Sequence, residues 1–159
     1  MTLDQFRPMV SRVLSPFVEG VRRLGLSPDA VSVVAFLLAL AAAGAFVLAG
    51  QEPWWYAVGA LLVFGNGWLD LVDGALAREL GVESEGGDLL DHVLDRYADV
   101  ALVAGLATGT GAFALGFAAV TGVLLTSYLG TQAQAVGLDR VYAGVMGRAD
   151  RLALVGVGG

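Results

Sequence analysis

Apolar stretches of membrane-spanning length constrain this chain more than any other feature of its sequence. Residues 30–49 are almost entirely apolar, and about 20 such residues are what an α-helix needs to cross ~30 Å of hydrocarbon. Further apolar stretches occupy roughly 54–78, 88–107 and 113–136. Since 57% of the chain is hydrophobic and its mean hydropathy is +0.73, the composition is that of a membrane protein. We therefore predict an all-α, polytopic transmembrane helix bundle.

The segments on either side of these stretches predict how the chain is organised. Residues 1–25 mix apolar residues with arginines at helical spacing, which is typical of an amphipathic helix at a membrane surface. A Ser-Pro-Asp sequence at 27–29 favours the start of the first span, so the transmembrane domain is taken as 26–159. A fifth apolar segment begins at Leu152 and stops at Gly159. We therefore expect a C-terminally truncated chain, with a short terminal anchor as the alternative.

The arginines predict the topology, because all nine basic residues are arginine and they are unevenly placed. They precede the first span, flank the polar segment between the second and third spans, and occur again in 137–151, whereas the other two connections have none. By the positive-inside rule, the N-terminus and these two segments face the cytoplasm. We expect a multi-pass protein of the cell membrane.

Four aspartates lie on either side of the polar segment that connects the second and third spans. A carboxylate near a bilayer is costly and is therefore usually functional. The pattern is D-x2-D-G-x2-A-R-x8-G-x3-D-x3-D, filled by Asp70, Asp73, Gly74, Ala77, Arg78, Gly87, Asp91 and Asp95. Asp70 and Asp73 share one helix face because they are three residues apart. Asp91, Asp95 and Asp99 share a face of the next helix because they are four residues apart. A short loop should make these helices antiparallel neighbours with facing carboxylates.

Such an all-oxygen ligand set favours Mg²⁺, Mn²⁺ or Ca²⁺ over zinc. A divalent ion held there would suit a diphosphate substrate, whose charge it neutralises. The absence of cysteine and the single His92 argue against thiol chemistry and a His-rich zinc site. The net charge of −6 argues against a nucleic-acid partner.

Neighbouring residues are assigned more ordinary roles. Gly74 and Gly87 offer bare backbone to a ligand or a neighbouring helix, and Arg78 is placed to bind a phosphate or a base edge. Asp99 is expected to pair with Arg96 or a neighbouring helix at least as readily as with metal. Asp88 is expected to cap the third long helix. His92 should point away from the acidic face.

The complete aspartate pattern resembles the signature of the CDP-alcohol phosphotransferases, also called CDP-alcohol phosphatidyltransferases. The segments GLSPDAVS at 25–32 and GRADRL at 147–152 are also similar to family segments, so the resemblance covers about 25–152. It implies a six-span fold, of which this chain holds about four spans and the start of a fifth, and a homodimer. Within the family, the chain resembles the phosphatidylinositol phosphate synthase and archaeal phospholipid synthase branch.

The resemblance implies that the hydroxyl of a small polar alcohol attacks the β-phosphate of a CDP-linked lipid and that CMP leaves. The lipid would be CDP-diacylglycerol or its archaeal ether counterpart, CDP-archaeol. Two ions of Mg²⁺ or Mn²⁺ would be held by Asp70, Asp73, Asp91 and Asp95, and Asp95 would also be the base. The CDP group would be held by Asp29, Ala30, Val31, Ser32, Gly74, Ala77, Arg78, Ser84 and Gly87.

The fourth span contains the residues that the resemblance relates to the acceptor alcohol. Branches that use inositol phosphate resemble S-Y-x-K-A-R-A-E-A there, whereas residues 127–135 of this chain carry Gly130 and Gln132 in place of the cations. This difference favours, by a small margin, a neutral or zwitterionic acceptor near Gln132. Arg148 and Arg151 remain as contacts for an anionic one.

Two other functions compete with this interpretation. The same carboxylates would serve a divalent-cation transporter, although transport favours polar residues through the depth of several spans. A membrane scaffold with a vestigial motif is the third hypothesis, and the intact signature argues against it.

Overall fold

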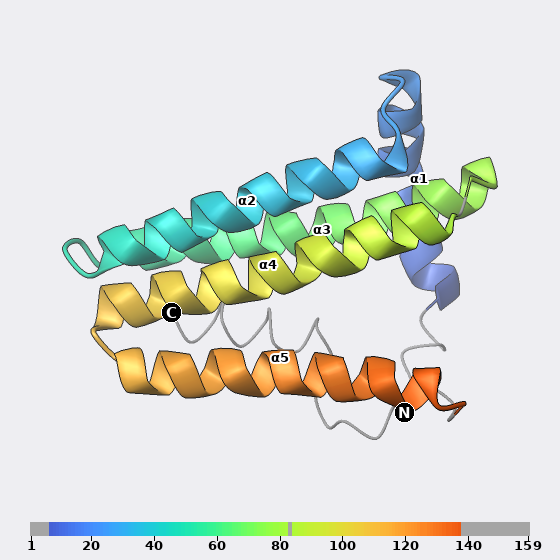
Figure 1. Ribbon diagram of the computed structural model, residues 1–159. Helices are drawn as coiled ribbons and strands as arrows, with labels where there is room; N and C mark the ends of the chain where they lie inside the picture. The colour runs from blue at the N-terminus through green and yellow to red at the C-terminus, as the bar shows by residue number, and fades with distance from the viewer. Residues whose placement is uncertain (1–6, 83, 138–159) are drawn as a thin grey trace.

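The computed structural model describes residues 7–82 and 84–137, and every regular element within them is an α-helix (Figure 1). The helices are α1 (Arg7–Arg23), α2 (Pro28–Ala49), α3 (Trp55–Leu80), α4 (Glu85–Thr110) and α5 (Phe113–Ala135). The predicted all-α fold class is confirmed.

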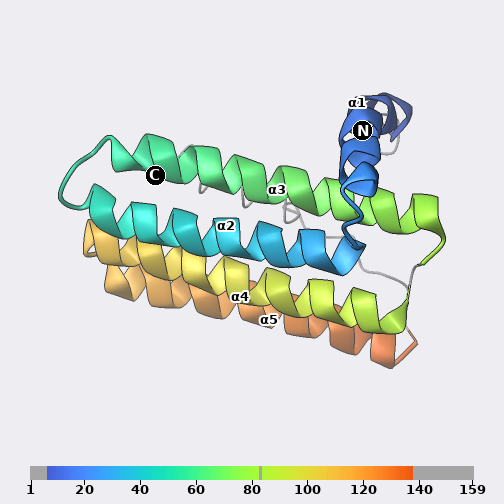
Figure 2. The ribbon, with the colours of Figure 1, turned by 90° about the horizontal axis from the view of Figure 1, so that it is seen from above.

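Helix α2 organises the bundle, because it packs along both α3 and α4. Helix α5 packs against α4, and α1 lies across one end of the long helices and contacts α3 (Figures 1 and 2). The expected antiparallel arrangement of α3 and α4 is present, but their main packing partner is α2 rather than each other. Side chains from α3 and α4 therefore meet beside α2.

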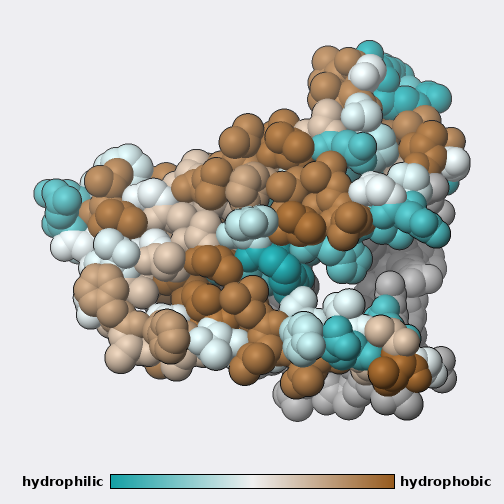
Figure 3. Space-filling model, viewed as in Figure 1, coloured by the Kyte–Doolittle hydropathy of each residue, from teal (hydrophilic) through white to brown (hydrophobic). Residues whose placement is uncertain are grey.

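Three of the described helices, α2, α3 and α5, are long and apolar enough to cross a membrane. Helix α4 is as long as α3 but carries more charged residues, among them Asp91, Asp95, Arg96 and Asp99, and is not one of the three. It nevertheless runs alongside them (Figure 2). Apolar side chains cover much of the bundle surface in Figure 3, as lipid contact requires.

Close contacts between small residues hold α4 against α2. A Cβ placed on Gly105 or Gly109 would overlap the carbonyl oxygen of Ala43 or Phe46 on α2. Such contacts let two backbones approach, which is the main source of helix association where lipid removes the hydrophobic driving force. Gly116 on α5 approaches Ala107 in the same way. These glycines therefore mark places of close helix packing.

Caps define the helix ends at which α2 and α4 begin. The Ala30 amide donates to Ser27 Oγ at 3.2 Å, so the predicted start of the first span is confirmed. Helix α4 begins earlier than expected, because the Gly87 amide donates to Ser84 Oγ at 3.0 Å. The prediction that Asp88 caps this helix is wrong: Ser84 is the N-cap, and Asp88 lies in the first turn.

Candidate active site

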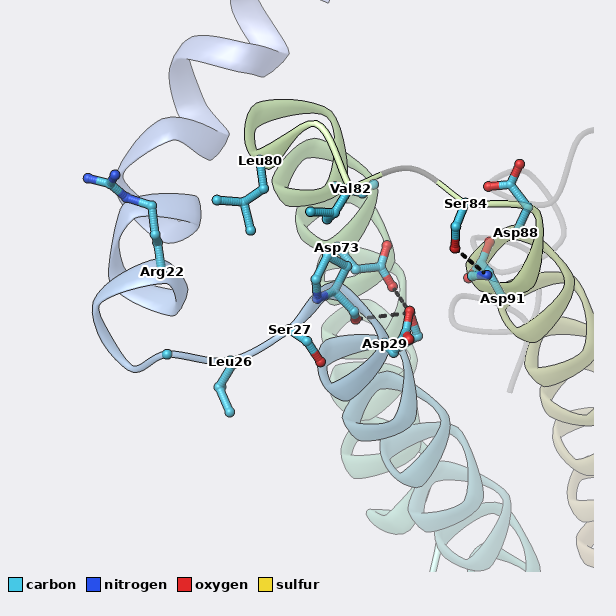
Figure 4. Close-up of a pocket in the computed structure, with 16 residues that line it drawn as sticks. Arg22, Leu26, Ser27, Asp29, Asp73, Leu80, Val82, Ser84, Asp88 and Asp91 are labelled. Atoms are coloured by element: carbon cyan, nitrogen blue, oxygen red, sulfur yellow. Dashed lines mark hydrogen bonds between the residues drawn. The ribbon is translucent and has the colours of Figure 1, made fainter.

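A cavity of about 560 Å³ lies at the end of the bundle where α2 and α4 begin and α3 ends (Figure 4). This volume is in the range of pockets that bind small molecules. Its polar lining comes from Arg22, Ser27, Asp29, Ser32, Asp73, Ser84, Asp88 and Asp91. Leu26, Leu80 and Val82 add apolar surface, so the cavity suits a ligand with both polar and apolar parts.

A second, much smaller cavity of about 10 Å³ adjoins the first, since Ser32 and Asp91 line both. The remaining lining residues are Ala35, Phe36, Asn66, Asp70, Leu94, Asp95 and Ala98. The small cavity therefore lies among α2, α3 and α4 and contains three of the four signature aspartates.

The structure brings Asp70, Asp91 and Asp95 together. One carboxylate oxygen from each lies within 4.8 Å of the other two, and all three side chains are partly buried. Oxygens that bind one divalent ion lie about 2.0–2.6 Å from it, so opposite ligands are about 4–5 Å apart. The donor set, all oxygen and all acidic, thus fits a hard divalent cation.

Asp73 has a different environment from the other three. It is 6% exposed, and its Oδ2 accepts a hydrogen bond from Ser32 Oγ at 2.6 Å. The same hydroxyl lies 3.2 Å from the Pro28 carbonyl, but its single proton favours the shorter bond to the carboxylate. Asp73 faces the larger cavity and lies outside the Asp70–Asp91–Asp95 cluster.

The predicted CDP contacts gather around the larger cavity with three exceptions, Ala30, Val31 and Arg78. Asp29, Ser32, Gly74, Ala77, Ser84 and Gly87 line it. A Cβ on Gly87 would lie 3.2 Å from Ser84 Oγ and 3.4 Å from Asp29 Oδ1, so the first turns of α4 and α2 meet there. Val31 is buried in a core cluster with Val72, and the Ala30 amide donates to Ser27, the N-cap of α2.

Arg78 folds back toward the cavity wall. Its guanidinium Nη1 would lie 3.4 Å from a Cβ on Gly74, one helical turn earlier. The side chain is exposed and belongs to the last turn of α3. Arg78 is therefore close enough to reach an anion bound over Gly74.

Arg96 contacts two aspartates on α4. Its Nη1 lies 3.2 Å from Asp99 and its Nη2 lies 3.7 Å from Asp95. Asp99 is thus paired with Arg96, as the sequence predicted, and lies deeper than the acidic cluster. His92 is exposed and its Nδ1 lies 2.7 Å from the Asp88 carbonyl oxygen, in agreement with a position off the acidic face.

Of the three predicted acceptor residues, only Gln132 belongs to the described part of the chain, and it lines neither of these two cavities. Gln132 is exposed on α5, which packs against α4. Arg148 and Arg151 lie outside the described residues.

Among the cavity-lining residues that the sequence interpretation missed, two have polar side chains able to bind a ligand. Arg22 of α1 lines the larger cavity and Asn66 of α3 lines the smaller one. Asn66 is four residues before Asp70 within an apolar stretch, a spacing that puts both on one helix face and was available in the sequence. No spacing pattern predicts Arg22, because α1 reaches the site only through its packing on α3.

Together, the bundle and its acidic end define a class: a membrane-type α-helical protein with an acidic cluster that fits a divalent cation, beside a ligand-sized cavity. The chain belongs to the CDP-alcohol phosphatidyltransferase family, whose family model matches residues 26–157. Members of this family are transferases of phospholipid synthesis, so the predicted family and enzyme class are confirmed.

Two relatives illustrate the similarity. The archaetidylinositol phosphate synthase of Methanothermobacter thermautotrophicus is 32% identical over 155 residues, and the match covers 96% of this chain and 74% of the relative. The phosphatidylinositol phosphate synthase of Streptomyces avermitilis is 35% identical over 155 residues, with 93% and 62% covered. The chain thus spans between about three fifths and three quarters of their lengths.

Solved structures agree with the fold. The crystal structure of the Mycobacterium tuberculosis phosphatidylinositol phosphate synthase with CDP-DAG bound matches with a TM-score of 0.77 and 31% identity, covering 92% of this chain and 75% of that one. The same enzyme with manganese and citrate matches with a TM-score of 0.78 and 30% identity, covering 91% and 70%.

Proposed function

We propose that this protein transfers the phosphatidyl-type group of a CDP-linked lipid to a hydroxyl of a small polar alcohol and releases CMP. The observation that carries the proposal is the convergence of Asp70, Asp91 and Asp95 beside the larger cavity. The bound CDP-DAG and manganese of the solved relatives support a CDP-lipid donor and a divalent ion.

Asp70, Asp91 and Asp95 would hold a divalent ion, with Asp73 joining them for a second. Such ions, Mg²⁺ or Mn²⁺, neutralise the charge of the diphosphate and of the departing CMP. Around them, Asp29, Ser84 and Gly87 form the wall where a nucleotide would bind, and Arg78 would contact a phosphate over Gly74. These residues position the donor with its β-phosphate near the acidic cluster.

Asp95 would act as the base. It would take the proton of the acceptor hydroxyl as the new oxygen–phosphorus bond forms and the bond to CMP breaks. Arg96 Nη2 lies 3.7 Å from the Asp95 carboxylate and helps to orient it.

The acceptor is a small polar alcohol, and the relatives' names make inositol phosphate the first compound to test. Neutral inositol is the matched comparison, because Gly130 and Gln132 replace two cations in the fourth-span pattern. Glycerol phosphate, serine and glycerol complete the set.

The site would face the cytoplasm, since Arg22, Arg23 and Arg78 lie at the end of the bundle that holds it. Helix α1 would lie at that interface, with Leu14 and Val18 packed on Val72 and Leu76. We further propose a homodimer and the six-span fold that the family resemblance implies.

Cation transport is the alternative use of the same carboxylates. It would need a polar path through the far half of the bundle. There the described interior is the apolar cluster of Ala39, Ala42, Phe46, Val63, Ala98 and Leu102, which supports the transferase over a transporter.

CMP release from CDP-diacylglycerol or CDP-archaeol, with Mg²⁺ or Mn²⁺ and each acceptor, tests the proposal. We expect metal-dependent release that Asp95→Asn reduces at least ~100-fold, within the range typical of a lost general base. Glu85→Gln, an exposed acidic residue on the same helix that lines neither cavity, is the control. Full turnover by Asp95→Asn would reject the base, and metal flux into liposomes without nucleotide would favour the transporter.

A further inference from the structure

Asn66 has the lowest exposure, 1%, of the buried polar and charged residues in the described part of the chain. Its Nδ2 donates to the Ala35 carbonyl oxygen at 2.8 Å, a bond that ties α3 to α2. Because a carbonyl can only accept, this contact fixes which end of the amide carries the nitrogen. The side-chain oxygen Oδ1 is thereby turned the other way.

Asn66 Oδ1 is buried and has no hydrogen-bond partner among residues 7–82 and 84–137. Buried polar atoms in native proteins are nearly always paired, so an exception calls for a ligand, an ion or a water. The other such atom within the described ranges, Trp68 Nε1, belongs to a residue that lines neither cavity. Asn66, in contrast, lines the small cavity together with Asp70, Asp91 and Asp95.

The chemistry of this cavity identifies what fits it. Carboxylate and amide oxygens accept hydrogen bonds and bind cations, so the side chains that line this space suit a cation, a donor or both. The volume of about 10 Å³ is about what one water-sized particle occupies. A water that binds a cation through its oxygen and donates a hydrogen to Asn66 meets both conditions.

We propose that Asn66 is a positioning residue of the cation site, and that its Oδ1 accepts a hydrogen bond from a water shared with the ion held by Asp70, Asp91 and Asp95. The inference rests on the proposed function only in taking this cluster as the cation site. Asn66 thereby fixes the ion's hydration on the side of the site that faces the core.

A purely structural role is the competing explanation, because Asn66 also joins α3 to α2 through Ala35. Two substitutions separate these roles. Asn66→Ala removes both the nitrogen and the oxygen. Asn66→Asp retains an oxygen for the cavity and replaces the nitrogen that donates to Ala35. It also adds an acidic group, which should favour a cation and not weaken its binding.

The experiment is a Mn²⁺ titration of the purified full chain in detergent, with free Mn²⁺ read by electron paramagnetic resonance and thermal unfolding measured in parallel. We expect Asn66→Ala to weaken Mn²⁺ binding about 10–100-fold, as loss of an outer-shell partner does. Asn66→Asp should unfold at a lower temperature than wild type and bind Mn²⁺ at least as tightly. Gly105→Ala, which disturbs the α2–α4 contact away from the site, should lower the unfolding temperature and leave Mn²⁺ affinity unchanged.

Equal Mn²⁺ affinity in wild type, Asn66→Ala and Asn66→Asp would overturn the proposal, as would an equal loss in both Asn66 variants. If Asn66→Ala does not fold, Asn66→Asp alone decides, because weaker binding by this variant contradicts a role for the oxygen. CMP release on the same preparations keeps the two proposals apart. Wild-type protein that binds Mn²⁺ through Asn66 yet releases no CMP would reject the transferase and not the role of Asn66.

Discussion

At the scale of the residue, the hydrogen bond between Ser32 and Asp73 shows how a buried carboxylate is stabilised in the wall of the larger cavity. Asp73 is 6% exposed, and burying a charge is costly unless it is hydrogen-bonded. The Ser32 hydroxyl meets this need at 2.6 Å from a different helix. One contact therefore both stabilises the α2–α3 packing and orients a predicted metal ligand.

Ser32→Ala should lower the free energy of unfolding by about 1–3 kcal/mol, the usual effect of leaving a buried group without its partner. Thermal unfolding in detergent measures this. Ser15→Ala, at an exposed position on α1, should behave as wild type. A Ser32→Ala protein as stable as wild type would show that the bond contributes nothing.

Residue spacing predicted part of this site and missed the rest for a physical reason. Asp91 and Asp95, four apart, share a face and reach Asp70, as expected. Spacing within one helix says nothing about contacts between helices. The pairing of Asp73 with Ser32, 41 residues away, therefore appears only in the structure.

At the scale of the element, the α2–α4 contact depends on residues without side chains. Gly109 lies directly against the Phe46 carbonyl, whereas a Cβ on Gly122 of α5 would meet nothing within 4 Å among the described residues. The two positions can therefore be compared directly, because a side chain would clash at Gly109 and would fit at Gly122.

Gly109→Ala should destabilise the bundle by about 1–3 kcal/mol, because the added methyl group forces two backbones apart. Gly122→Ala should be neutral or stabilise by up to about 1 kcal/mol, since alanine is the better helix former. Unfolding temperatures in detergent compare them. Equal effects of the two changes would contradict the packing account.

The sequence predicted which segments form helices, but it predicted less well where each helix begins and which other helices it packs against. The glycines at 86 and 87 suggested a loop, yet α4 already includes them because Ser84 caps its first turn. Likewise, a short connection indicated that α3 and α4 are antiparallel. It gave no sign that each packs mainly on α2.

At the scale of the whole molecule, the apolar helices and the arginine distribution together define an orientation in the membrane. The turn between α2 and α3 and the start of α4 lie at opposite ends of the bundle (Figure 1). With Arg22, Arg23 and Arg78 near the second end, the positive-inside rule supports the proposal that this end faces the cytoplasm.

Because the chain has no cysteine, single introduced thiols report this orientation cleanly. Gln51→Cys, in the α2–α3 turn, should react with a membrane-impermeant maleimide on intact cells. Glu85→Cys, also exposed, should react only after the membrane is opened. The reverse labelling pattern would place the acidic site on the outer face.

The central claim, that α3 and α4 aim their carboxylates at a shared divalent ion, is tested most directly by Mn²⁺ titration of Asp91→Asn beside wild type. His92→Gln is the control, because this exposed neighbour points away from the cluster. The account predicts saturable binding by wild type and by His92→Gln, and binding at least ~10-fold weaker in Asp91→Asn, since a neutral amide replaces a charged oxygen ligand. Unchanged Mn²⁺ affinity in Asp91→Asn, in a protein that folds normally, would contradict it.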